Sequence, residues 1–98
     1  MHFVYILRCA DEALYVGETS DLARRLERHH DGTASRFTAR RRPVVMVYAE
    51  EYPDQKHALA RERQLKRWSH AKKDALIFGD RKKLKQLSAC VSRHARHP

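Results

Sequence analysis

Apolar and β-branched side chains are concentrated in two short segments near the start of the chain. Residues 2–8 are rich in aromatic and β-branched side chains, which favour a strand. Residues 14–18 have the same character, and the polar residues 9–13 between the two segments have the composition of a turn. The simplest interpretation is a β-hairpin.

Side chains on a strand alternate between its two faces. Tyr5 and Leu7 therefore share one face of the first strand, and Tyr15 and Gly17 share one face of the second. Whether the two tyrosines lie on the same face of the hairpin depends on its register, which the sequence leaves open.

The pattern next changes to a helical period of apolar residues. It predicts a helix over residues 20–30, capped by Thr19 or Ser20. Residues 31–43 contain glycine, small polar residues and a run of arginines, so they are predicted to be a loop. Residues 44–50 form the clearest strand in the chain.

The second half of the chain is predicted to be helical. Pro53 and Asp54 begin a helix that runs to Trp68, and Ser69 caps a further helix that stops at Gly79.

The length of 98 residues is enough for one core only. We expect a single domain over residues 1–87, with another helical turn or two over residues 81–87. Residues 88–98 are basic and poorly patterned, so we expect a flexible C-terminal tail there.

Two basic residues of the first helix are placed differently from the others. Leu22 and Leu26 define the apolar side, and Arg25 and His29 form an i, i+4 pair at its flank, at the rim of the core. Such a pair can bind one phosphate. The alternative is an arginine stacked on an aromatic ring and a histidine bonded to a backbone carbonyl.

An acidic residue interrupts the apolar stripe of the second helix. Ala58, Leu59 and Leu65 form that stripe, and Glu62 lies near its middle. A carboxylate seldom faces a core without a partner. Glu62 could pair with Lys66 one turn later, or it could bind a divalent cation such as Mg²⁺.

The charge of the chain indicates the class of partner. It has 21 Lys and Arg residues against 12 Asp and Glu, a net charge of +9, which favours a polyanion and first of all nucleic acid. Cys9 and Cys90 lack disulfide-framework spacing, and the histidines lack zinc-ligand spacing, so we expect reduced thiols and no zinc site. No apolar run is long enough for a membrane span. We therefore expect a cytoplasmic protein without a membrane partner.

Four segments in this order and spacing resemble the GIY-YIG nuclease family, and within it the small stand-alone bacterial YhbQ-like group. They are "FVY" at 3–5, "YVG" at 15–17, "DLARRLERH" at 21–29 and "ALARERQLKRW" at 58–68. The resemblance covers about residues 3–68. It implies an α+β fold, in which a small three-stranded antiparallel sheet is flanked by helices.

The two halves of the family's motif match unequally. Tyr5 takes the place of the tyrosine that ends the first half, with Phe3 and Val4 where glycine and isoleucine would stand. Tyr15 and Gly17 match the second half directly. The resemblance therefore implies a catalytic tyrosine at each position and a structural role for Gly17.

The resemblance also implies a metal-dependent hydrolysis of phosphodiester bonds. Arg25 matches the family's catalytic arginine, His29 the histidine or tyrosine one turn later, and Glu62 the metal-binding glutamate, which would hold Mg²⁺ or Mn²⁺. The general base stays open among Tyr5, Tyr15 and His29.

Under this resemblance, basic residues outside the site would bind flanking phosphates without reading sequence. These residues are Arg36, Arg40, Arg41, Arg42 and Lys66. DNA is the favoured substrate, and RNA stays open because phosphate contacts do not read the 2′-hydroxyl. We expect an endonuclease with little sequence specificity, and structure-selective action in DNA repair or recombination is one form of that activity.

Two positions depart from the family's pattern. Glu18 follows the second motif half and adds a carboxylate, either as a partner of Arg25 or as an obstacle to anion binding. Many relatives place an asparagine downstream of the third helix, whereas this chain has Asp80 or Arg81 near that place and no asparagine at all. The alternative function is therefore a nucleic-acid-binding module on the same fold with little or no catalysis.

Overall fold

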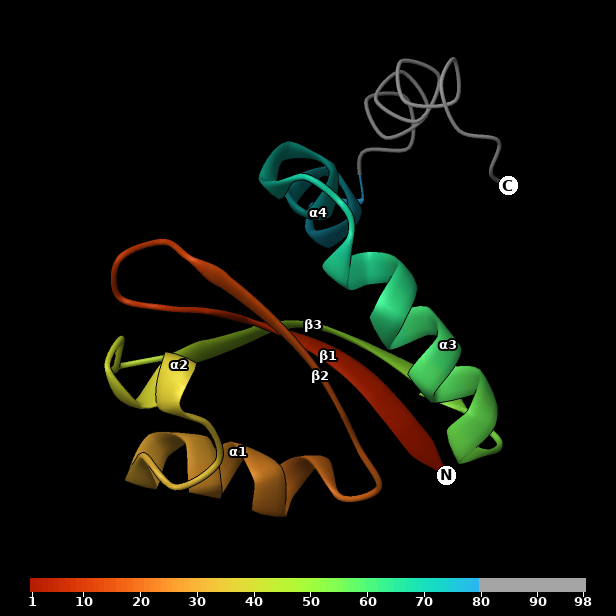
Figure 1. Cartoon of the computed structure of the whole chain (residues 1–98), viewed down its shortest axis with the longest axis horizontal. Coiled ribbons are helices and arrows are strands. Elements are labelled where there is room, and N and C mark those ends of the chain that lie inside the picture. Colours follow the sequence, from red (N-terminus) through yellow and green to blue (C-terminus); the bar gives the residue numbers. More distant parts are fainter. Residues whose placement is uncertain (80–98) are drawn as a thin grey trace. The chain divides into compact units, whose positions relative to one another are not determined.

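The computed structural model describes residues 1–79 of the chain. The predictions for the final helical turns, the basic tail, Cys90 and the position of the missing asparagine lie outside the described residues. The elements in chain order are β1 (His2–Arg8), β2 (Leu14–Thr19), α1 (Leu22–Asp31), α2 (Arg36–Ala39), β3 (Val45–Tyr52), α3 (Gln55–Lys66) and α4 (His70–Ile77) (Figure 1).

The three strands form one antiparallel sheet in the order β2-β1-β3, which confirms the predicted α+β fold and the hairpin. In the hairpin, Tyr5 lies opposite Gly17, and Leu7 lies opposite Tyr15. Residues opposite each other point to the same face, so this register puts Tyr5 and Tyr15 on one face. It settles the point that the strand pattern left open.

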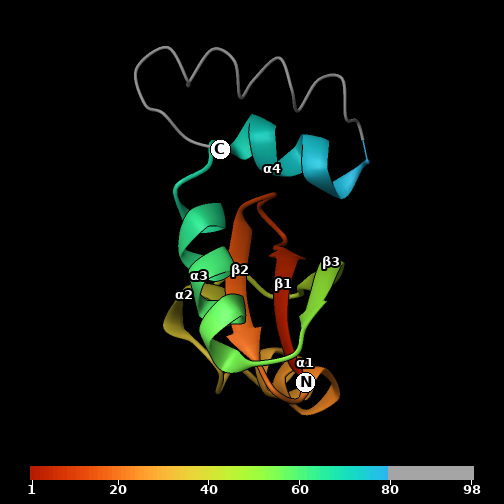
Figure 2. The same cartoon turned by 90° about the vertical axis from the view of Figure 1, so that its right-hand side faces the viewer.

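The chain divides into two compact units, Met1–Lys66 and a second that begins at Arg67. The predicted single domain over residues 1–87 stays a prediction. In the first unit, α1 and α2 lie on one side of the sheet and α3 on the other (Figures 1 and 2). The central strand β1 is therefore buried on both faces, and Val4 to Leu7 are all fully buried.

The core on the α1 side is built around Tyr5 and Leu7. Leu22 and Leu26 of α1 pack against this cluster, as their helical period predicted, and Tyr15 packs there too. The functional residues expected on β1, β2 and α1 therefore lie on the same side of the sheet in the first unit.

Two local predictions were wrong. Asp21, rather than Thr19 or Ser20, caps α1: its carboxylate accepts a hydrogen bond from the Arg24 amide at 3.1 Å, and the Thr19 hydroxyl bonds to the backbone of Asp21 instead. The predicted loop contains the short helix α2. Ser35 caps it and accepts a bond from the Thr38 amide at 3.1 Å.

The second unit contains α4, which Ser69 caps as predicted. Gly79 follows the helix with a φ of +70°, a conformation that favours glycine. Within this unit the ammonium of Lys72 lies 4.2 Å from the ring centroid of Trp68. None of the helices within residues 1–79 is both long and apolar enough to cross a membrane.

Candidate active site

A chain of three buried side chains links β1, α1 and α2. The Tyr5 hydroxyl lies 2.8 Å from Nε2 of His29, and Nδ1 of His29 lies 2.8 Å from the hydroxyl of Thr38. All three residues are fully buried. The ring of His29 is therefore held from both sides.

The predicted position of His29 at the rim of the core was wrong. It is fully buried because α2 covers this end of α1 and brings Thr38 to the imidazole. Neither ring nitrogen is available to a phosphate, so His29 cannot form the direct phosphate contact considered from the helix period. Arg25, one turn earlier, is half-buried, as a residue at the rim should be.

Burial shifts the pKa of both members of the Tyr5–His29 pair. Desolvation raises the pKa of Tyr5 to about 12, although Arg25 opposes this shift by hydrogen bonding and by its positive charge. Desolvation lowers the pKa of His29 to about 4, and the charge of Arg25 adds to that shift. At neutral pH the pair is therefore an uncharged imidazole and a protonated phenol.

The low pKa of His29 predicts an acid-sensitive fold. The folded pKa of about 4 lies below 6.5, the ordinary value of a histidine, so between these values the unfolded chain binds a proton that the folded chain does not. Stability is then lost as the pH falls. We expect the free energy of unfolding to drop by about 2 kcal/mol from about pH 7 to about pH 5.

Urea unfolding at the two pH values measures this loss. His29→Gln is the control, because it lacks the imidazole and should lose less stability over the same interval. Equal stability of the wild-type protein at both pH values would contradict the prediction.

Tyr15 joins the same cluster from β2. Its ring centroid lies 5.2 Å from that of His29 and 6.4 Å from that of Tyr5. The ring centroid of Phe37, on α2, lies 5.9 Å from that of Tyr15, and the guanidinium of Arg41 lies 3.9 Å from the centroid of Phe37. Tyr15 is half-buried, so it is the more accessible of the two candidate tyrosines.

Gly17 makes room for the phenol of Tyr5. It lies opposite Tyr5 in the hairpin, and a Cβ at this position would clash with the Tyr5 hydroxyl and the adjoining ring carbon. The glycine of the second motif half is therefore required by the close approach of a side chain, since its φ is not positive.

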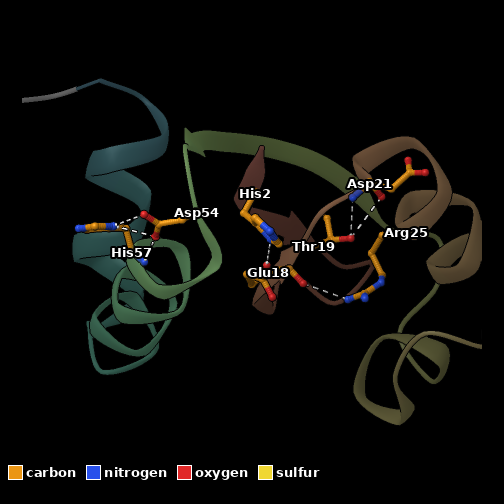
Figure 3. A network of polar contacts seen from close by, with 7 residues as sticks. All are labelled: His2, Glu18, Thr19, Asp21, Arg25, Asp54 and His57. Carbon is orange, nitrogen blue, oxygen red and sulfur yellow. Dashed lines mark hydrogen bonds and ion pairs between the residues drawn. The ribbon is translucent and has the colours of Figure 1, made fainter.

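Arg25 and Glu18 meet at the end of β2, but not through the carboxylate (Figure 3). The guanidinium of Arg25 donates to the backbone oxygen of Glu18 at 3.2 Å. The carboxylate of Glu18 instead binds Nδ1 of His2 at 2.9 Å. Because Glu18 pairs with Val4 in the register, its side chain lies on the face opposite Tyr5. The carboxylate is thus neither the expected partner of Arg25 nor an obstacle on the tyrosine face.

A shallow pocket at the beginning of α1 contains Arg25. It is lined by Thr19, Ser20, Asp21, Arg24, Arg25 and Arg28. Three guanidinium groups against one carboxylate make this pocket suitable for an anion.

Glu62 lies on α3 with a side chain that is only 16% exposed. It forms the i, i+4 ion pair with Lys66 that its spacing allowed, at 3.4 Å. Its charge also contributes to raising the pKa of Tyr5. The charges of Arg25 on α1 and Glu62 on α3 therefore shift the pKa of Tyr5 in opposite directions.

The predicted nucleic-acid-binding arginines fall into two classes. Arg36 and Arg40 are exposed, and their side chains have no hydrogen bond or ion pair within residues 1–79. Arg41 binds Asp11 at 3.1 Å and the Phe37 carbonyl at 3.0 Å, and Arg42 binds the carbonyls of Ala39 and His30. Arg41 and Arg42 therefore also order the segment that carries them.

The sequence analysis missed two groups. One is Thr38, and its only signal was the serine three residues earlier that caps a short helix. The other is Glu50, which accepts two hydrogen bonds from Arg61 at 2.9 Å and one from each of Tyr48 and Tyr52. These bonds link β3 to α3, and both carboxylate oxygens of Glu50 have partners within the cluster.

The sequence of the chain is similar to those of known proteins. Residues 1–74 match the family described as the GIY-YIG catalytic domain. The UPF0213 protein of Bacillus pumilus is 41% identical over 76 residues, which are 78% of this chain and 78% of that protein. The UPF0213 protein of Staphylococcus aureus (strain Mu3) is 43% identical over 76 residues, which are 78% of this chain and 93% of that protein.

Two solved structures are also similar to this chain. The solution NMR structure of a UPF0213 protein from Bacillus halodurans matches with a TM-score of 0.51 at 36% identity, over 78% of this chain and 81% of that one. The solution NMR structure of the E. faecalis protein EF2693 also matches with a TM-score of 0.51, at 29% identity, over 99% of this chain and 93% of that one.

Proposed function

Because the chain belongs to the GIY-YIG family, a family of nucleases, we propose that it is a divalent-metal-dependent endonuclease that hydrolyses phosphodiester bonds in DNA. The observation that carries this proposal is that Arg25 and Glu62, from two different helices, both act by their charge on the pKa of the buried phenol of Tyr5. A charge-stabilising cation, a carboxylate and a phenol are the groups that phosphodiester hydrolysis needs.

Glu62 offers one carboxylate ligand to a metal such as Mg²⁺ or Mn²⁺. Within residues 1–79, no group of three or more His, Cys, Asp or Glu side chains is arranged for a metal ion. Mg²⁺ nevertheless often binds through one carboxylate together with waters and substrate phosphate oxygens. The partner of Glu62, Lys66, is 53% exposed and free to turn toward solvent. A metal held by Glu62 would polarise the phosphate and stabilise the leaving oxygen.

The other residues are assigned roles according to their exposure. Arg25, in its anion pocket, would bind the scissile phosphate and offset the charge that builds on it. Tyr5 and Tyr15 are the remaining candidates for the general base, since both ring nitrogens of His29 are engaged by Tyr5 and Thr38.

Flanking phosphates would be bound mainly by the exposed Arg36 and Arg40. Arg41, Arg42 and Lys66 would contribute less, because each also binds a group of the protein itself. Phosphate contacts carry no sequence information. We therefore propose weak sequence specificity. Structure-selective action on DNA in repair or recombination, in the cytoplasm, is compatible with this proposal.

Nicking of supercoiled plasmid tests the function directly. We expect the wild-type protein to nick only with Mg²⁺ or Mn²⁺ and not with EDTA. Glu62→Ala should lower the nicking rate by at least about 10²-fold while DNA binding persists, because the variant loses the metal ligand and keeps the basic surface. Glu51→Ala is the matched control, an exposed glutamate on β3.

The alternative function, a binding module without catalysis, makes a different prediction. If wild type and Glu62→Ala bind DNA equally and neither cuts plasmid, branched or single-stranded DNA with either metal, the nuclease proposal is wrong. The absence of asparagine from the chain is the feature that favours this alternative.

A further inference from the structure

The buried chain of Tyr5, His29 and Thr38 holds a limited number of protons. The imidazole of His29 is uncharged at neutral pH, so one ring nitrogen donates a hydrogen bond and the other accepts one. Two arrangements satisfy both 2.8 Å contacts. The proton is either on Nδ1, facing Thr38, or on Nε2, facing Tyr5.

With the proton on Nε2, His29 donates to Tyr5, and the phenolic proton must find another acceptor. The guanidinium of Arg25 can only donate, and within residues 1–79 the Tyr5 hydroxyl has no other recorded partner that accepts. Tyr5 is fully buried, so this arrangement leaves a buried donor without a partner.

With the proton on Nδ1, every donor in the chain has an acceptor. Tyr5 donates to Nε2 of His29, and Nδ1 donates to the Thr38 hydroxyl. The Thr38 hydroxyl in turn donates to the Ser35 carbonyl at 3.4 Å or to the Ser35 hydroxyl at 3.0 Å. The Tyr5 oxygen is then left with a lone pair for Arg25.

We propose that the proton of His29 lies on Nδ1 and that Thr38 is the positioning residue that accepts this hydrogen bond, so that the hydroxyl of Tyr5 points at His29 and its oxygen presents a lone pair to the candidate active site. This inference rests on the proposed function for its consequence. An attacking water beside Arg25 would then meet an acceptor, whereas the opposite arrangement would present a proton to it.

The local structure explains why Thr38 holds this position. Ser35 caps α2 by accepting a bond from the Thr38 amide, and this bond fixes the backbone that carries the Thr38 side chain. Hydroxyl and carbonyl oxygens of Ser35 lie on the far side of the Thr38 hydroxyl. Thr38 is therefore set to accept from His29 and to donate to Ser35.

Nitrogen NMR of the His29 ring, in protein labelled with ¹⁵N and without substrate, tests the inference. We expect a protonated Nδ1 and a non-protonated Nε2 in the wild-type protein and in Thr38→Ser. In Thr38→Val, a variant of similar shape without a hydroxyl, the Nδ1–H group loses its acceptor, so we expect the ¹⁵N signal of Nδ1 to shift while the proton stays on Nδ1, because Tyr5 still donates to Nε2. The nicking rate of Thr38→Val should fall about 10- to 100-fold with DNA binding unchanged, and Thr38→Ser should restore it.

Two results would overturn the inference: a wild-type His29 protonated on Nε2, or a folded Thr38→Val whose Nδ1 signal and nicking rate both match those of the wild type. The wild-type spectrum decides the first point even if Thr38→Val does not fold. Because the spectrum needs no activity, a failure of the proposed function shows itself separately, as a wild-type protein with the expected proton on Nδ1 that cuts no DNA.

Discussion

Tyr5→Phe is expected to lower the nicking rate by about 10²- to 10⁴-fold, the range for loss of a general base, while DNA binding stays near the wild-type value. The substitution removes only a hydroxyl that lies 2.8 Å from His29 and leaves the buried ring in place. It affects the phenol whose pKa both Arg25 and Glu62 shift by their charge. Plasmid nicking and filter binding on the same preparation measure the two quantities.

Tyr48→Phe is the matched control. Tyr48 also has a partly buried hydroxyl with a raised pKa, about 12, but it binds Glu50 on the opposite face of the sheet. We expect nicking to survive in this variant. Tyr15→Phe distinguishes the two candidate bases. If Tyr15→Phe abolishes nicking and Tyr5→Phe does not, the half-buried Tyr15 is the base and the assignment to Tyr5 is wrong.

Gly17→Ala is expected to destabilise the protein by about 1–3 kcal/mol, the usual cost of overpacking a core, and to reduce nicking at least as strongly as Tyr5→Phe. The added methyl group would collide with the Tyr5 hydroxyl and the adjoining ring carbon. Either the ring moves away from His29, or the β1–β2 hairpin distorts. Urea unfolding measures the stability, and the NMR spectrum of the His29 ring reports whether its bond to Tyr5 persists.

A double-mutant cycle separates this collision from a general effect of alanine in a strand. In a Tyr5→Leu background the ring is absent, so Gly17→Ala should cost clearly less than in the wild type. An equal cost in both backgrounds would show that Gly17 serves the backbone and not the tyrosine.

The predictable part of the fold came from local patterns. Residues 2–8 and 14–18 have the composition of strands whatever they pair with, and both were placed within one residue of β1 and β2. The helix that begins after Pro53 and Asp54, and the one capped by Ser69, were also recognisable from local signals. The exception was α2, because four residues are too few for a helical period to be visible.

The candidate site was only partly predictable. Glu62 stood out because it interrupts the apolar stripe of its helix, and Arg25 because it lies at the flank of the apolar side; neither signal needs tertiary information. The burial of His29 could not be inferred in this way, because it depends on Thr38, nine residues away in a segment that was predicted to be a loop.

The sequence by itself determined the strands, the main helices, the basic character of the chain and the charged residues that break a pattern, since all of these depend on neighbours within one or two turns. Only the tertiary structure decided that Tyr5 and Tyr15 share a face, that Gly17 clears space for a phenol, and that the carboxylate of Glu18 turns to His2. These three features depend on which residues of different strands lie opposite each other. A one-residue change of register would reverse the faces while leaving every local pattern intact.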